Sequence, residues 1–187
     1  MMMRWTLTLG ACALMAGAGG AAAAGGSTLD AAIGQVLPAG VDQADVHRLN
    51  TRWNGQAVVF VDYPVGNDRV LKAFVPEGQG YRTVDIDTFE EEGGTAEISA
   101  IAFANADQDA AQELIVLGAW PVQHYDVEGT LYEVRIFDDL TADAQPLATV
   151  SQHFGEGCDC SRRDDKPETY RYKTMAAVRK ELSRMGY

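Results

Sequence analysis

The chain has 187 residues with 15 basic and 27 acidic side chains, which gives a formal net charge of −12 and a sequence pI near 4.5. We expect no nucleic-acid partner, because phosphate binding needs concentrated positive charge. Hydrophobic residues make up 47% and charged residues 22% of the chain. This balance predicts an ordinary globular protein with one core, and it disfavours both a disordered chain and a polytopic membrane protein.

The first residues have the pattern of a secretory signal peptide. Arg4 is their only charge, an apolar run extends over residues 5–18, and only small residues follow as far as Gly26. Ala22 and Ala24 match an A-x-A cleavage motif. We therefore predict a signal peptide over residues 1–24 and a periplasmic or secreted protein.

An alternative processing route starts from Cys12. Residues 9–12 read Leu-Gly-Ala-Cys and resemble a lipobox, in which Cys12 would become the lipidated first residue of a bacterial lipoprotein. The apolar stretch before Cys12 is short for such a signal. This alternative predicts a lipid anchor in the bacterial envelope, and it is the one route by which we expect a membrane contact.

Residues 25–56 predict a helix or turn segment. Ser27 and Asp30 have the spacing of a capping box, and a short apolar stretch follows that ends at Leu37 and Pro38. This segment is expected to precede a single β-rich domain over residues 57–187.

From Ala57 onward the pattern changes to short β-rich runs separated by turn residues. Connections such as residues 65–68 and 77–80 are short and polar, as hairpins require, and they leave no room for parallel crossover helices. The predicted strands read AVVFVDY, RVLKAFV, YRTVDI, EISAIAF, ELIVLGAW, LYEVRIF and PLATVSQ. The sequence therefore predicts a mainly β fold with antiparallel sheets.

Two parts of this β-rich domain have matching patterns. The stretch from AVVFVDY to YRTVDI and the stretch from ELIVLGAW to PLATVSQ each read as a meander of three strands. We predict two blade-like three-strand meanders that derive from an internal repeat. A chance likeness between β-hairpins is the alternative.

The C-terminal residues predict an amphipathic helix over residues 174–185. Apolar side chains recur there at helical spacing, and Gly186 is placed to stop the helix. The members of this stripe are Met175, Val178, Leu182 and Met185. We expect the helix to cover an open edge or face of a sheet, because an uncovered edge invites aggregation.

An acidic loop between two predicted strands has the spacing of a calcium-binding loop. Oxygen-bearing side chains alternate with spacers, and a backbone carbonyl would complete the series. The predicted ligands are Asn105, Asp107, Asp109, the carbonyl of Ala111, and Glu113. The three carboxylates would repel one another without a counter-charge. The alternative is an acidic turn whose side chains bond only to the local backbone.

The same loop resembles the calcium loop of FG-GAP and VCBS-type repeats, which lies between strands of β-propeller blades. The matching residues are Asn105, Asp107, Asp109, Glu113 and Leu114, on the pattern D-x-[DN]-x-D-x-x-x-[DE]-L. The resemblance covers about residues 100–140, and Gln108 and Ala110 stand where the family usually has glycine. It implies calcium and blade-like meanders, although the chain is too short for a propeller of four or more blades.

The mature chain would hold two cysteines, Cys158 and Cys160. In an oxidising compartment an even pair favours a disulfide, although residues two apart must bend to form one. Free or intermolecular thiols are one alternative. With His153 upstream, a zinc or copper site is another.

Catalytic signatures are absent from the sequence: it holds no G-x-S-x-G, H-E-x-x-H, P-loop or dinucleotide motif. The best acid/base candidates are His124 and Asp126 in a polar loop, where such residues are more often simply exposed. An enzyme is therefore less expected than a binding protein.

These features together predict an exported, non-catalytic binding protein, calcium-stabilised, that acts through a protein partner. The acidic composition suits a basic partner, and exported inhibitors of cationic envelope enzymes, and immunity proteins against them, are analogous in size and address. The predicted contact surface is the loop PVQHYDVEG with Trp120, His124 and Tyr125, because exposed aromatic loop residues often carry binding energy.

Two alternatives stay open at this point. One is a metal-handling protein or hydrolase that uses either His124 and Asp126 or the cysteine pair Cys158 and Cys160. The other is a structural envelope lipoprotein anchored at Cys12.

Overall fold

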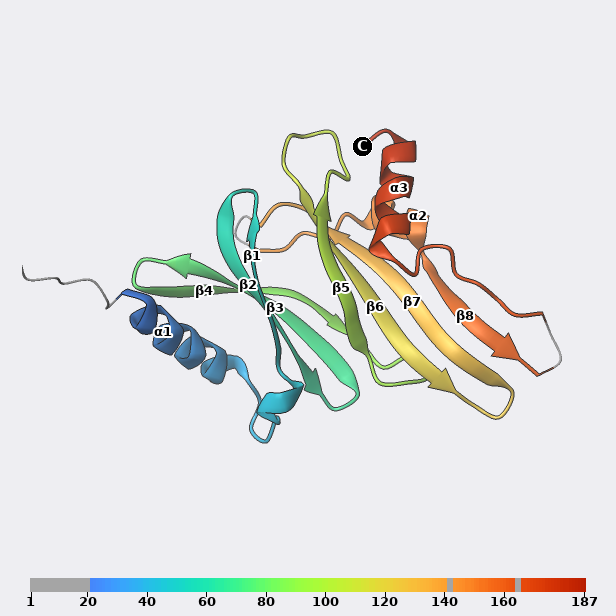
Figure 1. The fold of residues 1–187 in the computed structure, drawn as a ribbon, viewed down its shortest axis with the longest axis horizontal. Coiled ribbons are helices and arrows are strands. Elements are labelled where there is room, and N and C mark those ends of the chain that lie inside the picture. Colours follow the sequence, from blue (N-terminus) through green and yellow to red (C-terminus); the bar gives the residue numbers. More distant parts are fainter. Residues whose placement is uncertain (1–20, 141–142, 164–165) are drawn as a thin grey trace, which may run out of the picture.

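Two antiparallel sheets of four strands each make up most of the protein in the computed structural model (Figure 1). Residues 21–140, 143–163 and 166–187 are described, with side chains from Thr28 onward. Cys12 and most of the predicted signal peptide lie outside the described residues. None of the helices in the described part of the chain has the length and apolarity needed to span a membrane.

The first sheet is a meander in which each strand pairs with its neighbour in the chain. Its strands are β1 (His47–Trp53), β2 (Gln56–Val65), β3 (Asp68–Glu77) and β4 (Gly80–Phe89). Two-residue turns join them. Asn54 and Gly55 form the first turn, with φ of 48° and 79°. Positive φ at both positions is the requirement of the tight hairpin turn that Asn-Gly favours.

The second sheet repeats this topology in the order β5-β6-β7-β8. Its strands are β5 (Glu97–Ala104), β6 (Glu113–Gln123), β7 (Val127–Phe137) and β8 (Glu156–Arg162). The prediction of antiparallel sheets is therefore confirmed. The prediction of three-strand meanders is wrong, because each sheet has four strands.

Helices cover the outer faces of both sheets. They are α1 (Ala21–Val36), α2 (Ala148–Phe154) and α3 (Met175–Met185), and a short 3-10 turn, η1 (Gln43–Asp45), precedes β1. The side-chain hydroxyl of Thr174 caps α3 by accepting from the N–H of Ala177, and Gly186 ends it in the left-handed conformation. The predicted C-terminal helix over residues 174–185 is confirmed.

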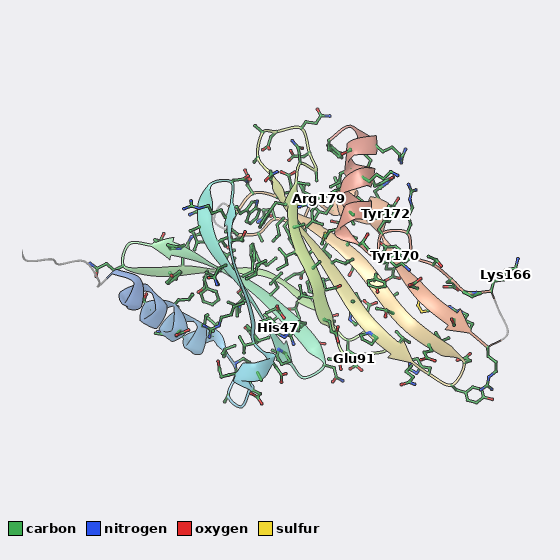
Figure 2. The ribbon with its side chains drawn as sticks, viewed as in Figure 1. His47, Glu91, Lys166, Tyr170, Tyr172 and Arg179 are labelled. Atoms are coloured by element: carbon green, nitrogen blue, oxygen red, sulfur yellow. A yellow bond between two sulfur atoms is a disulfide. The ribbon has the colours of Figure 1, made fainter. Side chains whose placement is uncertain are left out.

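Three apolar clusters hold these layers together, and Figure 2 shows side chains filling the space between the sheets. Between the sheets, residues of the first such as Phe60 and Leu71 pack with residues of the second such as Leu114 and Trp120. The alternate residues of β6 face α2 and α3, and Ile33 of α1 packs on the far face of the first sheet. This two-residue alternation follows from strand geometry.

Two strands escaped prediction. The first, β1, lies inside the predicted helix or turn segment 25–56, and five of its seven side chains are exposed, so it has little apolar pattern to predict a strand. The second, β8, holds Gly157, at which a Cβ would meet the ring of Tyr170 at 2.3 Å. Tyr170 lies near β8 and α3, beside Tyr172 (Figure 2). A glycine that admits an aromatic ring is a tertiary feature with no local pattern.

The predicted strand PLATVSQ is the third correction, because most of it forms α2. Val150 and Phe154 stand four residues apart and face the second sheet. Ser151 holds the helix to the edge of β7, where its hydroxyl oxygen accepts from the N–H of Ile136 at 2.9 Å. Contacts with β7 therefore override the strand-like composition of this segment.

Candidate metal centre

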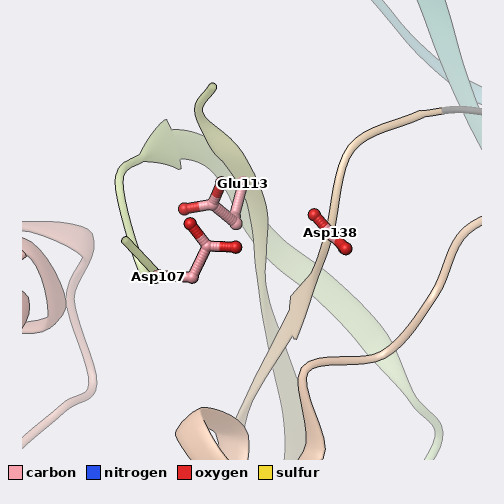
Figure 3. A group of neighbouring side chains, drawn as sticks. All are labelled: Asp107, Glu113 and Asp138. Carbon is pink, nitrogen blue, oxygen red and sulfur yellow. The ribbon is translucent and has the colours of Figure 1, made fainter. Parts of the chain in front are cut away.

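Three carboxylates converge at one end of the second sheet (Figure 3). Asp107 lies in the loop after β5, Glu113 is the first residue of β6, and Asp138 directly follows β7. One oxygen of each lies within 4.8 Å of the others. No ion pair joins any of the three to a lysine, arginine or histidine among the described residues. Their mutual repulsion is therefore uncompensated within the described residues.

Glu113 is the buried member of this cluster. Its side chain is fully enclosed, and its Oε2 accepts from the backbone N–H of Ala106. Its other oxygen, Oε1, is buried and has no hydrogen-bond partner in the described structure. Burial raises the pKa of Glu113, and the negative charges of Asp107 and Asp109 raise it further against the opposing bond from Ala106. A buried carboxylate oxygen without a partner is costly, and either a bound cation or a proton on the carboxyl would remove that cost.

Asn105 contributes a second unpartnered oxygen in the same loop. Its Nδ2 donates to the backbone carbonyl of Asp109 at 3.0 Å, which fixes the orientation of the amide group. Its Oδ1 is buried and has no partner among the described residues. A neutral amide oxygen is a common calcium ligand beside carboxylates.

The intervening loop folds by local bonds from its own aspartates. Asp107 Oδ1 accepts from the N–H of Asp109 at 2.8 Å, and Asp109 Oδ1 accepts from the N–H of Ala111 at 2.7 Å. These turns are the local bonds expected of an acidic turn. They leave the second oxygen of Asp107 for other partners, and Asp109 is not a member of the convergent group. Ala111 is held in the same turn.

Asp138 is the member that the sequence pattern missed. The β6–β7 ladder pairs Leu114 with Phe137, so Glu113 and Asp138 occupy the next step of the same ladder. The signal that could have found Asp138 is this hairpin register, which extends the loop motif to the neighbouring strand. Asp138 is thus a member of the acidic cluster that lies outside the loop from which the ligands were predicted.

The three carboxylates lie close enough together to share one divalent cation. Calcium takes six to eight oxygens at about 2.3–2.6 Å, so two ligands on opposite sides of the ion lie about 5 Å apart. Magnesium holds its ligands at about 2.0–2.1 Å and needs them correspondingly closer. Carboxylate and amide oxygens are hard ligands of the kind that calcium prefers.

The predicted contact surface needs one correction, at Trp120. Its side chain has no exposed area, its ring lies 6.1 Å from that of Phe89, and its indole N–H donates to the carbonyl of Glu90 at 2.7 Å. Gly118 makes room for both rings, because a Cβ there would lie under 3.0 Å from each. Trp120 is therefore a core residue.

His124 and Tyr125 do lie at the turn between β6 and β7. Tyr125 is 83% exposed, and the guanidinium of Arg163 lies 4.3 Å from the centre of its ring. His124 and Asp126 line a surface cavity of about 270 Å³ at the same turn. This end of the second sheet presents an exposed aromatic residue.

Cys158 and Cys160 are joined by a disulfide within β8, with their Cα atoms 5.2 Å apart. His153 lies on α2, and its Nε2 is 3.0 Å from Oε1 of Glu181 on α3. Neither sulfur is therefore a free thiol, and His153 is paired with the carboxylate of Glu181. This arrangement offers no support for a zinc or copper site at these three residues.

Comparison with known proteins finds no matching family model, no matching curated protein and no matching solved structure. The assignment of a function therefore depends on the geometry of the acidic site and on the chemistry of the surface.

Proposed function

We propose that this protein is an exported, non-catalytic binding protein that holds a calcium ion at Asp107, Glu113 and Asp138 and acts through a basic protein partner. The observation that carries the proposal is the buried Oε1 of Glu113, which has no hydrogen-bond partner among the described residues. The role of the ion is structural, because it ties the loop before β6 to the chain that leaves β7.

Three further observations support calcium. The convergent carboxylates have no cationic neighbour in an ion pair within the described chain, Asn105 supplies a second buried oxygen, and the loop resembles that of FG-GAP repeats. An unsatisfied buried acceptor costs about 1–3 kcal/mol, and more when it is charged. A dication removes that cost and the repulsion between the carboxylates. Asn105, backbone carbonyls and water would complete the coordination.

Isothermal titration of the chain from Gly25, purified in chelator and then dialysed, tests this site. We expect calcium to bind with one-to-one stoichiometry and magnesium to bind more weakly. Glu113→Gln should abolish binding, whereas Glu97→Gln, at the exposed first residue of β5, should leave it unchanged. A wild-type protein that takes up no calcium would refute the cation site.

The partner is proposed from the net charge of the chain and from its predicted export out of the cytoplasm. A net charge of −12 attracts basic proteins and steers their approach. Negative charges also lie close together around Glu92. Partial burial raises the pKa of Glu92, and the charges of Glu156 and Glu133 raise it further. Small exported proteins that inhibit cationic envelope enzymes, or confer immunity to them, form the analogous class. His124 and Tyr125 are the proposed contact residues.

A pull-down from the native envelope, with the chain from Gly25 as bait, tests the partner. We expect one stoichiometric basic protein that Tyr125→Ala releases. Retention in calcium and loss in chelator would support the partner and the structural role of the ion together. A partner indifferent to chelator would separate the two roles, and no partner in either buffer would overturn the binding function.

A further inference from the structure

The turn between β1 and β2 places the side chain of Asn54 beside the two segments that carry Glu113 and Asp138, at the start of β6 and after the end of β7. Asn54 has a φ of 48° and is the one non-glycine residue with positive φ among those the structure describes. Asparagine tolerates this conformation better than most residues. The turn therefore projects a carboxamide from the first sheet toward the second.

The carboxamide of Asn54 makes three bonds to the second sheet. Its Oδ1 accepts from the N–H of Gln112 at 2.8 Å, and its Nδ2 donates to the carbonyl of Gln112 at 3.1 Å. Nδ2 also donates to Oδ1 of Asp139 at 2.6 Å. Gln112 directly precedes Glu113, and Asp139 directly follows Asp138. One side chain thus holds the neighbours of two of the three convergent carboxylates.

The first sheet gives this side chain a rigid base. Trp53, the residue before Asn54, is 3% exposed, and its ring stacks on that of Phe103 with 5.7 Å between centroids. Its indole N–H also donates to the carbonyl of Gln112. The turn is therefore anchored in the core that joins the two sheets.

The turn and the two acidic-site segments share the wall of one surface cavity. A cavity of about 520 Å³ lies here, and its walls include Gln56, Ala110, Ala111 and Asp139. Asn54 and Asp139 both line this cavity, so the bonds from Asn54 cross directly between the turn and the two acidic-site segments beside it.

We propose that Asn54 is a positioning residue for the cation site, so that cation binding in the second sheet holds the β1–β2 turn of the first sheet in place. This inference rests on the proposed calcium site. Coupling between the two is reciprocal by linkage: a turn that orders the ligands strengthens binding, and a bound ion stabilises the turn.

The decisive variant is Asn54→Gly, which removes the carboxamide and keeps a backbone suited to positive φ. Asn67→Gly is the matched control, because Asn67 also lies in a turn of the first sheet and donates to Glu91. Isothermal titration with calcium chloride should show affinity reduced about 10- to 100-fold in Asn54→Gly, the range for residues that orient metal ligands. The Asn67→Gly protein should bind as the wild type does.

Two further readouts separate positioning from a general loss of stability. In chelator, Asn54→Gly should melt at a lower temperature than Asn67→Gly because it loses three hydrogen bonds rather than one, and only Asn54→Gly should in addition lose most of its calcium-induced rise. Hydrogen exchange on the wild type should slow at the β1–β2 turn amides when calcium is added. This measurement needs no variant, so it decides the matter even where Asn54→Gly folds poorly.

The outcomes distinguish this inference from the function on which it rests. If the wild type binds no calcium, the proposed site fails and the inference fails with it. If the wild type binds calcium, but Asn54→Gly binds equally well or turn exchange is unaffected by calcium, the coupling alone is overturned.

Discussion

Glu113 and Asp138 bring carboxylate oxygens within 4.8 Å of each other from the facing ends of two paired strands. Like charges that face each other across an antiparallel ladder destabilise a sheet. Here the pair is reinforced by Asp107, and one of its members is fully buried. The sheet therefore holds a repulsion that the proposed dication would convert into a crosslink.

Replacing Glu113 by glutamine should uncouple stability from calcium. Glutamine keeps the shape and removes the buried charge, so we expect the variant in chelator to be at least as stable as the wild type. At a calcium concentration one hundred times the dissociation constant, the wild type should gain about 2.7 kcal/mol and the variant nothing. Thermal unfolding with and without calcium measures both. An equal gain in the variant would contradict the assignment of Glu113.

Asp138→Asn tests the ligand that lies outside the loop motif. We expect calcium affinity to fall by about tenfold or more, because a carboxylate ligand is lost, while the amide oxygen of asparagine can still accept from the N–H of Asp139. Asp143→Asn is the control, since Asp143 is exposed in the same connection between β7 and α2. Titration calorimetry with calcium measures the affinity of both variants. An unchanged affinity in Asp138→Asn would restrict the site to the loop.

Trp120 and Tyr125 should respond to alanine in opposite ways. Trp120→Ala empties a fully buried site and should cost about 3–5 kcal/mol of unfolding free energy, measured in urea. Tyr125→Ala changes a largely exposed ring and should cost about 0.5 kcal/mol or less, while it weakens partner binding. A stable Trp120→Ala protein with impaired partner binding would return Trp120 to the contact surface.

Glu181 should make the packing of α3 sensitive to acid. Two hydrogen bonds from Arg184, one with His153, and the charge of Arg171 hold the pKa of this carboxyl well below its ordinary value of 4.5. Because the folded pKa is the lower one, the stabilisation is complete above the unfolded value and is lost as the pH falls below it.

Glu181→Gln should therefore be less stable than the wild type near neutral pH, and the difference should shrink as the pH falls below about 4.5. Urea unfolding over a pH series measures the difference. Glu168→Gln is the control, because Glu168 is half exposed in its ion pair with Arg162. A difference that stays constant into acid would show that the charge of Glu181 is not the cause.

The helix α3 and most of the hairpins could be predicted from the sequence because the patterns that indicate them are local. The apolar stripe of α3 and its Thr174 and Gly186 caps lie within one short segment, and each needs only its neighbours to act. Asp107 and Glu113 were likewise found from spacing along one loop. These features are the ones in which chain distance and spatial distance agree.

The features that could not be predicted from the sequence depend on contacts between residues far apart in the chain. Asp138 joins the site through strand register, Asn54 through a turn of the other sheet, and α2 forms because β7 offers its edge to Ser151. The prediction that Trp120 is exposed is wrong because Gly118, two residues earlier on the same face, leaves the space in which the ring of Trp120 is buried. None of these partners can be read from local composition or period.

The meander order of both sheets bears on how the chain folds as it emerges. Every strand pairs only with its neighbours in sequence, so each sheet can form through short loop closures alone. The first sheet has all its strands once Phe89 emerges, yet its inner face, with Phe60 and Leu71, is covered only when β5 and β6 of the second sheet follow with residues such as Phe103 and Leu114. Until then the incomplete chain exposes this apolar face, and such transiently exposed apolar surface is prone to aggregate.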